Sequence, residues 1–155
     1  MARLYGMDTL ISILHVTTAV FIVGPMAILP MTAMRAVRAG NGGQVAVLAK
    51  STMVFSWLSL IVFLLGFGAM GMADEEFGLT FTTPWILWSI ILYVIAFALS
   101  VFLVVPSMRK AAEALSGDAG SGGGAAAAGY PAIAAGSGIV SLLLVAVVVL
   151  MVWKP

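Results

Sequence analysis

One histidine, His15, lies in an apolar stretch that carries no charge, ISILHVTTAVFIVGPMAILP over residues 11–30. An imidazole in such surroundings can ligate haem or another metal, carry protons, or hydrogen-bond to a neighbouring helix, and the sequence leaves all three roles open. Because the chain has no second histidine, haem cannot be held by two histidines of one protomer. His15 would pair with a methionine, a symmetry mate or a partner subunit. His15 is therefore the candidate cofactor-binding residue, as a haem ligand.

Methionines and a short acidic run are the other groups that could do chemistry. Thioethers suit Cu(I), but among ten methionines only Met70 and Met72 form an M-x-M pair, so we expect methionine to fill apolar space. We expect Asp74, Glu75 and Glu76 to form a solvated helix cap rather than a cation site. The chain has no cysteine, which excludes disulfides, thiolate metal sites and Fe–S clusters. We assign no catalytic residue and no metal site, and lean towards a protein without enzymatic activity.

The composition explains why the chemical inventory is so small. Of the 155 residues, 63% are hydrophobic and 8% are charged, and the mean hydropathy is +1.18, which is far more apolar than a soluble domain. The formal net charge is +1, without the basic face that nucleic-acid binding needs. We therefore expect an integral membrane protein whose main surroundings are the lipid bilayer, and no nucleic-acid partner.

Four apolar stretches approach the roughly 20 residues that a helix needs to cross a bilayer. They predict an all-α, four-transmembrane-helix bundle with up-down-up-down topology, formed by one membrane domain over residues 1–155. The first two helices should join in a tight αα-hairpin at GNGG, and Pro84 suits the first turn of the third helix. The predicted helices span about residues 9–33, 51–73, 84–106 and 132–153, and a flexible Gly/Ala-rich linker spans about 117–129.

The distribution of Lys and Arg predicts the orientation of the bundle, because positive residues favour cytoplasmic loops. On the side of the two termini, the only Lys and Arg residues are Arg3 and Lys154. We therefore expect both termini on the outer side of the plasma (inner) membrane, crossed several times. The basic residues expected on the cytoplasmic side are Arg35, Arg38, Lys50, Arg109 and Lys110.

Prolines and small residues predict how the helices bend and pack. Pro25 and Pro30 lie inside the first span and should kink it, because each removes a backbone hydrogen bond. Ala134 and Gly138 form a small-x-x-x-small pair that favours close helix contact. A transporter or channel would more typically show paired broken helices in two related halves, and no such pair is clear from the sequence.

Two stretches carry a family resemblance: LHVTTAVFIVGPMAILP at residues 14–30 and PWILWSIILYVIAFALSVFLVVPSMRK at residues 84–110. They resemble a family of small four-helix bacterial integral membrane proteins of unknown function, grouped loosely with the CopD copper-resistance and HemJ protoporphyrinogen-oxidase membrane proteins. In that group a Leu-His pair early in the first helix is followed by an apolar stretch, commonly a tryptophan, and a glycine. Leu14, His15 and Gly24 match, while Phe21 and Ile22 stand where the tryptophan is expected.

The resemblance implies haem binding only through His15. HemJ-like members are thought to bind haem through this histidine and to need a lysine deeper in the bundle, and the third span here has neither lysine nor histidine. Porphyrinogen oxidation is therefore not expected.

Two functions of different classes follow. The first is an accessory or assembly subunit that docks laterally on a larger membrane complex, such as a respiratory complex, or on copies of itself. The alternative is a haem-binding membrane protein that uses His15 as axial ligand in haem handling or electron transfer.

Overall fold

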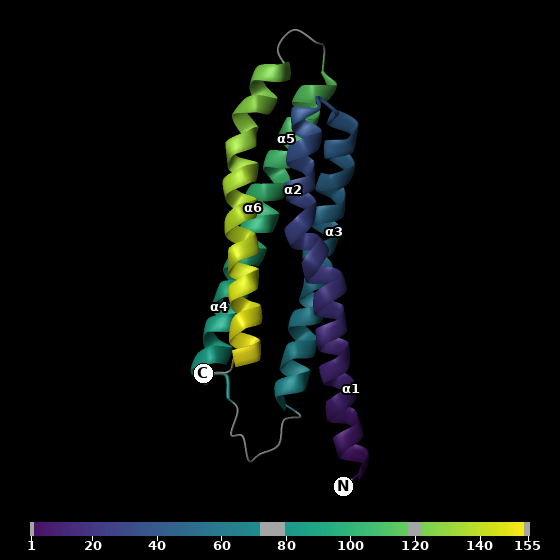
Figure 1. Cartoon of the computed structure of the whole chain (residues 1–155), viewed down its shortest axis with the longest axis vertical. Helices are drawn as coiled ribbons and strands as arrows, with labels where there is room; N and C mark the ends of the chain where they lie inside the picture. The colour runs from purple at the N-terminus through teal and green to yellow at the C-terminus, as the bar shows by residue number, and fades with distance from the viewer. Residues whose placement is uncertain (1, 72–79, 118–121, 154–155) are drawn as a thin grey trace.

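The computed structural model describes residues 2–71, 80–117 and 122–153, and it forms an elongated bundle of long helices (Figure 1). The chain passes along the bundle in an up-down-up-down order, as predicted. Four helical stretches are long and apolar enough to cross a membrane. The elements are α1 (Ala2–Thr18), the π-helical turn η1 (Ala19–Val23), α2 (Gly24–Arg38), α3 (Gly42–Gly71), α4 (Pro84–Leu99), the π-helical turn η3 (Ser100–Val104), α5 (Val105–Ser116) and α6 (Gly122–Trp153).

The helices are longer than the apolar stretches that predicted them. The first span begins before residue 9 and continues to Arg38, and the third continues through Pro106 to Ser116. The fourth begins at Gly122, so residues 122–129, expected to belong to a flexible linker, are helical. Its run of alanines explains the difference, because alanine has the highest helix propensity and offsets the neighbouring glycines. Residues 118–121 of the predicted linker lie outside the described residues.

A tight turn at residues 39–41 joins the first two spans, which confirms the predicted hairpin. Gly40 adopts a left-handed conformation with φ of 69°, which a residue with a side chain rarely adopts. The Asn41 side-chain oxygen accepts a hydrogen bond from the backbone N–H of Gln44, at 2.9 Å, and so caps the start of α3. The second connection is described only from residue 80, and the acidic run at residues 74–76 lies outside the described residues.

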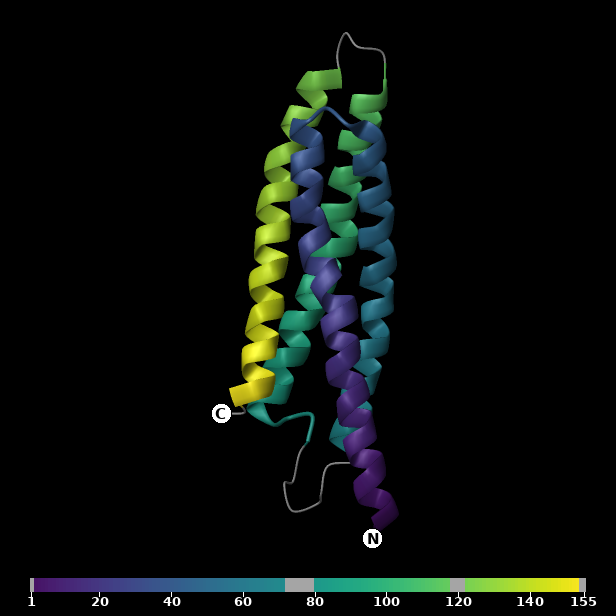
Figure 2. The same cartoon turned by 45° about the vertical axis from the view of Figure 1, so that its right-hand side comes forward.

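We call the end of the bundle with Ala2 and Trp153 the terminal end, and the end with Arg38 and Gly117 the basic end. Towards the basic end, α2, α3, α5 and α6 form a ring in which each helix packs closely against two neighbours. Towards the terminal end the helices separate into two pairs, α1 with α3 and α4 with α6 (Figures 1 and 2). None of the described residues of α1 is fully buried. The core therefore lies mainly in the ring.

Two π-helical turns mark the level at which the ring opens into pairs. Each precedes a proline, Pro25 after η1 and Pro106 after η3. Proline lacks the N–H that would bond to the carbonyl four residues earlier, and one extra residue in the turn allows the helix to continue past it. The predicted kink of the first span is thus a π-helical turn at Pro25, whereas α2 continues through Pro30.

Candidate functional site

His15 lies on the side of α1 that faces α3. Its Nδ1 atom is 3.0 Å from the backbone carbonyl oxygen of Val62, and the side chain is partly buried. A carbonyl oxygen only accepts hydrogen bonds, so Nδ1 carries the proton and donates it to Val62. This bond joins two helices that are far apart in the chain and adds a polar contact to the packing of α1 against α3.

Gly66, one helical turn beyond Val62, makes room for the imidazole. A Cβ atom on Gly66 would lie 3.1 Å from Cε1 of His15, a tighter approach than side chains normally make. The glycine therefore allows the ring to lie against the backbone of α3. At Gly68 the neighbour is Ile11, at an ordinary contact distance of 3.7 Å.

The tautomer of His15 determines what else its ring can do. With the proton on Nδ1 and the imidazole neutral, Nε2 carries a free lone pair. Within the part of the chain that the structure describes, no hydrogen bond engages Nε2. In metal sites, the ligating histidine typically donates its other N–H to a carbonyl or carboxylate, which fixes the ring orientation. The hydrogen bond and the close approach to Gly66 show that His15 takes part in the packing of α1 against α3.

Buried hydroxyl groups connect α3 to the third span, and the sequence analysis did not single them out. The Ser56 hydroxyl donates to the Thr52 carbonyl, so the Ser100 hydroxyl, 3.0 Å away, donates to Ser56. In the same way Ser59 donates to its own helix, and the Tyr93 hydroxyl donates to Ser59 at 2.8 Å. No buried side-chain polar atom among the described residues lacks a partner. The interior hydroxyls thus hold helices together.

Aromatic rings fill the space between α3 and α4, whose backbones are not closely packed. Phe63 and Tyr93 are stacked with ring centroids 4.7 Å apart and planes 14° apart. Phe67 and Phe97 extend this group along the two helices through edge-on and tilted contacts. One face of α3 carries Ser59, Val62, Phe63 and Gly66. His15 contacts this face from α1, and Tyr93 contacts it from α4.

The two π-helical turns belong to a short internal repeat. Residues 19–25 read AVFIVGP and residues 100–106 read SVFLVVP, with Val, Phe, Val and Pro at matching positions. In both, the π-helical turn comes first and proline ends the segment. Each broken span is followed by a long unbroken helix, and η1 packs against α3 as η3 packs against α6. The two hairpins therefore share this short repeat and the π-helical turn that precedes its proline.

Several other predicted residues have no part in this arrangement. A Cβ on Gly138 would meet nothing within 4 Å, whereas one on Gly136 would lie 2.9 Å from Cγ2 of Val104, so Gly136 rather than Gly138 makes the close helix contact. Met72 lies outside the described residues. Within the described ranges no group of three or more His, Cys, Asp or Glu residues could hold a metal ion.

Comparison with known proteins supplies the family. A search of curated proteins and a search of solved structures returned no match. The distant resemblance to CopD and HemJ stays a prediction. A family model described as "Predicted integral membrane protein (DUF2269)" matches residues 9–155. With four membrane-spanning helices and a match over nearly its whole length, the chain belongs to this family of integral membrane proteins.

Proposed function

We propose that this protein is a non-catalytic subunit that binds a larger membrane complex, such as a respiratory complex, through the exposed side of α1. The observation that carries the proposal is the packing of α1. In a closed ring of four helices each helix has two neighbours, but within the described residues α1 packs closely against one helix of another span, α3. Its counterpart in the second half of the chain, α4, likewise packs closely against one such helix, α6. However, α4 has buried residues, whereas none of the described residues of α1 is fully buried.

The exposed side of α1 is long and apolar, which suits a transmembrane helix of another protein. Leu10, Ile13 and Val16 are each more than half exposed. Van der Waals packing drives helix association in lipid, so a helix with one neighbour gains contacts from a second. The polar contact of His15 with Val62 holds α1 on α3 and fixes which of its sides remains available.

The interior of the bundle supports the same role. Its hydroxyl groups are paired within and between helices. Six charged residues of the described helices lie towards the basic end: Arg35, Arg38, Lys50, Arg109, Lys110 and Glu113. We place the protein in the plasma membrane with the basic end on the cytoplasmic side, following the distribution of Lys and Arg.

Photo-crosslinking from single positions tests the proposal. A photoreactive residue at Val16 of α1 is expected to form a discrete adduct with another membrane protein in intact membranes. The same residue at Val148 of α6, which is about equally exposed, serves as the control and should yield lipid adducts only. Lipid adducts alone from both positions, together with a mass of one protomer after gentle solubilisation, would contradict the proposal.

A second candidate function is supported by one observation, the hydrogen bond that orients His15. Donation from Nδ1 to Val62 leaves Nε2 available as an axial ligand, and haem bound there would supply one-electron chemistry. A Soret band in the purified protein that is lost in His15→Ala and kept in Thr18→Ala supports this function. The Thr18 hydroxyl bonds to the backbone carbonyls of Leu14 and His15 in its own helix and not to the imidazole, which makes it a suitable control. A colourless protein, or a band unchanged in His15→Ala, excludes it.

A further inference from the structure

At the basic end, a surface pocket of about 480 Å³ opens between α3 and α5. Its lining consists of Ala46, Lys50, Arg109, Ala112, Glu113 and Ser116. At one end of the pocket the two helices approach each other closely, because a Cβ on Gly42 of α3 would lie 2.6 Å from the hydroxyl of Ser116, a lining residue on α5.

The charged groups of the pocket are not neutralised by one another. Among the described residues, the side chains of Lys50, Arg109 and Glu113 form no hydrogen bond or ion pair. Two cations therefore face the pocket from two different helices, and one carboxylate lies beside them. Such a set can bind a ligand that carries one negative and one positive group.

The pocket lies at the depth of phospholipid headgroups. Lys50 comes directly before the apolar part of α3, and Arg109 comes directly after the apolar part of the third span. The two cations therefore mark the edge of the hydrocarbon region. Glu113 is one helical turn further from the membrane on α5, about 5–6 Å along the axis.

This order of charges matches one class of lipid. From the bilayer outwards, phosphatidylethanolamine presents its glycerol, then an anionic phosphodiester, then a primary ammonium. We propose that the pocket between α3 and α5 binds phosphatidylethanolamine, with Lys50 and Arg109 on the phosphate and Glu113 on the ammonium. Phosphatidylglycerol offers the phosphate without the ammonium. Phosphatidylcholine carries a quaternary ammonium that cannot donate a hydrogen bond to a carboxylate.

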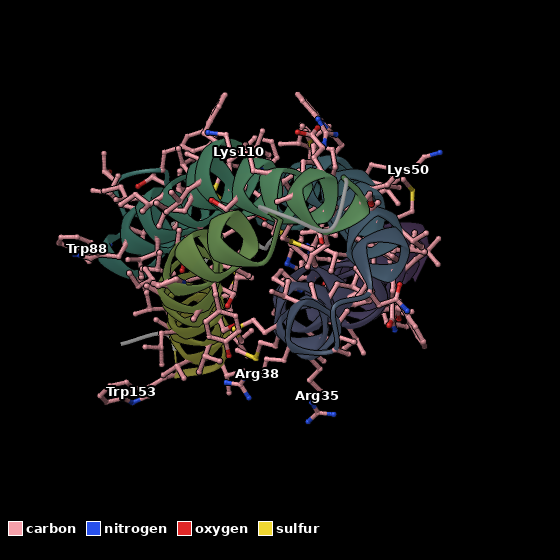
Figure 3. The ribbon with its side chains drawn as sticks, turned by 90° about the horizontal axis from the view of Figure 1, so that it is seen from above. Arg35, Arg38, Lys50, Trp88, Lys110 and Trp153 are labelled. Carbon is pink, nitrogen blue, oxygen red and sulfur yellow. The ribbon has the colours of Figure 1, made fainter. Side chains whose placement is uncertain are left out.

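The equivalent seam in the other half of the molecule, between α2 and α6, is closed. There the Arg38 guanidinium hydrogen-bonds to the Tyr130 hydroxyl, and its central carbon lies 5.0 Å from the centre of the Tyr130 ring. Figure 3 shows Arg38 on one side of the bundle, and Lys50 and Lys110 on other sides. One basic side chain is thus used within the protein, whereas Lys50 and Arg109 remain free for a ligand.

Lipid titration of the purified full-length protein tests the proposal. Added phosphatidylethanolamine is expected to raise the melting temperature more than equal amounts of phosphatidylglycerol or phosphatidylcholine. Native mass spectrometry should show the same order in lipid adducts. Glu113→Gln should remove the preference for phosphatidylethanolamine over phosphatidylglycerol, and Arg109→Gln should weaken the binding of both, several-fold.

Lys110→Gln is the matched control, because Lys110 adjoins Arg109 in the chain but does not line the pocket. It should leave both readouts unchanged. Equal stabilisation by phosphatidylethanolamine and phosphatidylglycerol, or an unchanged preference in Glu113→Gln, would overturn the proposal. Equal stabilisation by water-soluble glycerophosphoethanolamine would assign the pocket to a soluble phosphate ester and also overturn it.

Discussion

His15 donates a hydrogen bond from Nδ1 to the carbonyl oxygen of Val62, 3.0 Å away, across the contact between α1 and α3. The same imidazole lies against Gly66, where a Cβ atom would come within 3.1 Å of it. The position of the ring therefore depends on the carbonyl of Val62, which accepts its hydrogen bond, and on Gly66, which has no side chain to displace it.

We expect Gly66→Ala to lower the stability of the protein only while His15 is present. Alanine normally stabilises a helix interior by about 1 kcal/mol relative to glycine, so a loss would show that the ring is displaced. In the His15→Ala background the same change should be neutral or stabilising, a coupling of about 1 kcal/mol. Melting of the four proteins in mild detergent measures this cycle. Gly68→Ala, with an ordinary contact to Ile11, is the control, and additive effects of His15→Ala and Gly66→Ala would contradict the prediction.

Tyr93→Phe should destabilise the contact between α3 and α4 modestly. The change removes the hydroxyl that donates to Ser59 but keeps the ring that stacks on Phe63. Interhelical hydrogen bonds in membrane proteins contribute about 0.6 kcal/mol on average, so we expect a loss of that size. Tyr93→Leu should cost more, because the stacking is lost too.

Unfolding in a denaturing detergent, followed by circular dichroism, measures the effects at Tyr93. The control is Ser89→Ala, because the Ser89 hydroxyl bonds to the Trp85 carbonyl in its own helix. A Tyr93→Phe protein as stable as the parent, or equal losses for Tyr93→Phe and Tyr93→Leu, would count against the prediction.

Gly136→Ala should destabilise the contact of α6 with η3, because its Cβ would lie 2.9 Å from Cγ2 of Val104. Overpacking of this kind costs about 1–3 kcal/mol. Val104→Ala in the same chain should recover part of the loss, since it removes the clashing methyl group. Gly138→Ala, where a Cβ meets nothing within 4 Å, should have little effect. The melting temperatures of these variants test the prediction. Equal effects of Gly136→Ala and Gly138→Ala would contradict the contact between Gly136 and Val104.

The orientation in the membrane is testable because the chain contains no cysteine. We expect Ala39→Cys, in the turn at the basic end, to resist a membrane-impermeant maleimide in intact cells and to react after the membrane is opened. Thr82→Cys, before α4, should react from outside. Both positions are exposed, so accessibility depends on the side of the membrane. The reverse pattern would place both termini in the cytoplasm.

The sequence by itself determined the membrane class, the number of spans and their order. Apolar length, turn residues such as Gly40 and the first-turn proline Pro84 are local properties, and local properties can be read from a sequence. They also predicted His15 as the residue to examine. The extents of the helices were less predictable, because backbone hydrogen bonding carries α3 and α5 beyond the apolar residues.

Only the tertiary structure decided which residues face the interior. A helix in lipid is apolar on every side, so hydrophobic periodicity does not distinguish its buried face, and glycine or serine is compatible with either. Gly136 rather than Gly138 packs against a neighbouring helix, and the Ser56 hydroxyl hydrogen-bonds to the Ser100 hydroxyl, because the packing of the whole bundle sets which side of each helix faces inwards. The similarity of AVFIVGP and SVFLVVP is visible in the sequence, but only the structure shows that both segments form a π-helical turn before the proline.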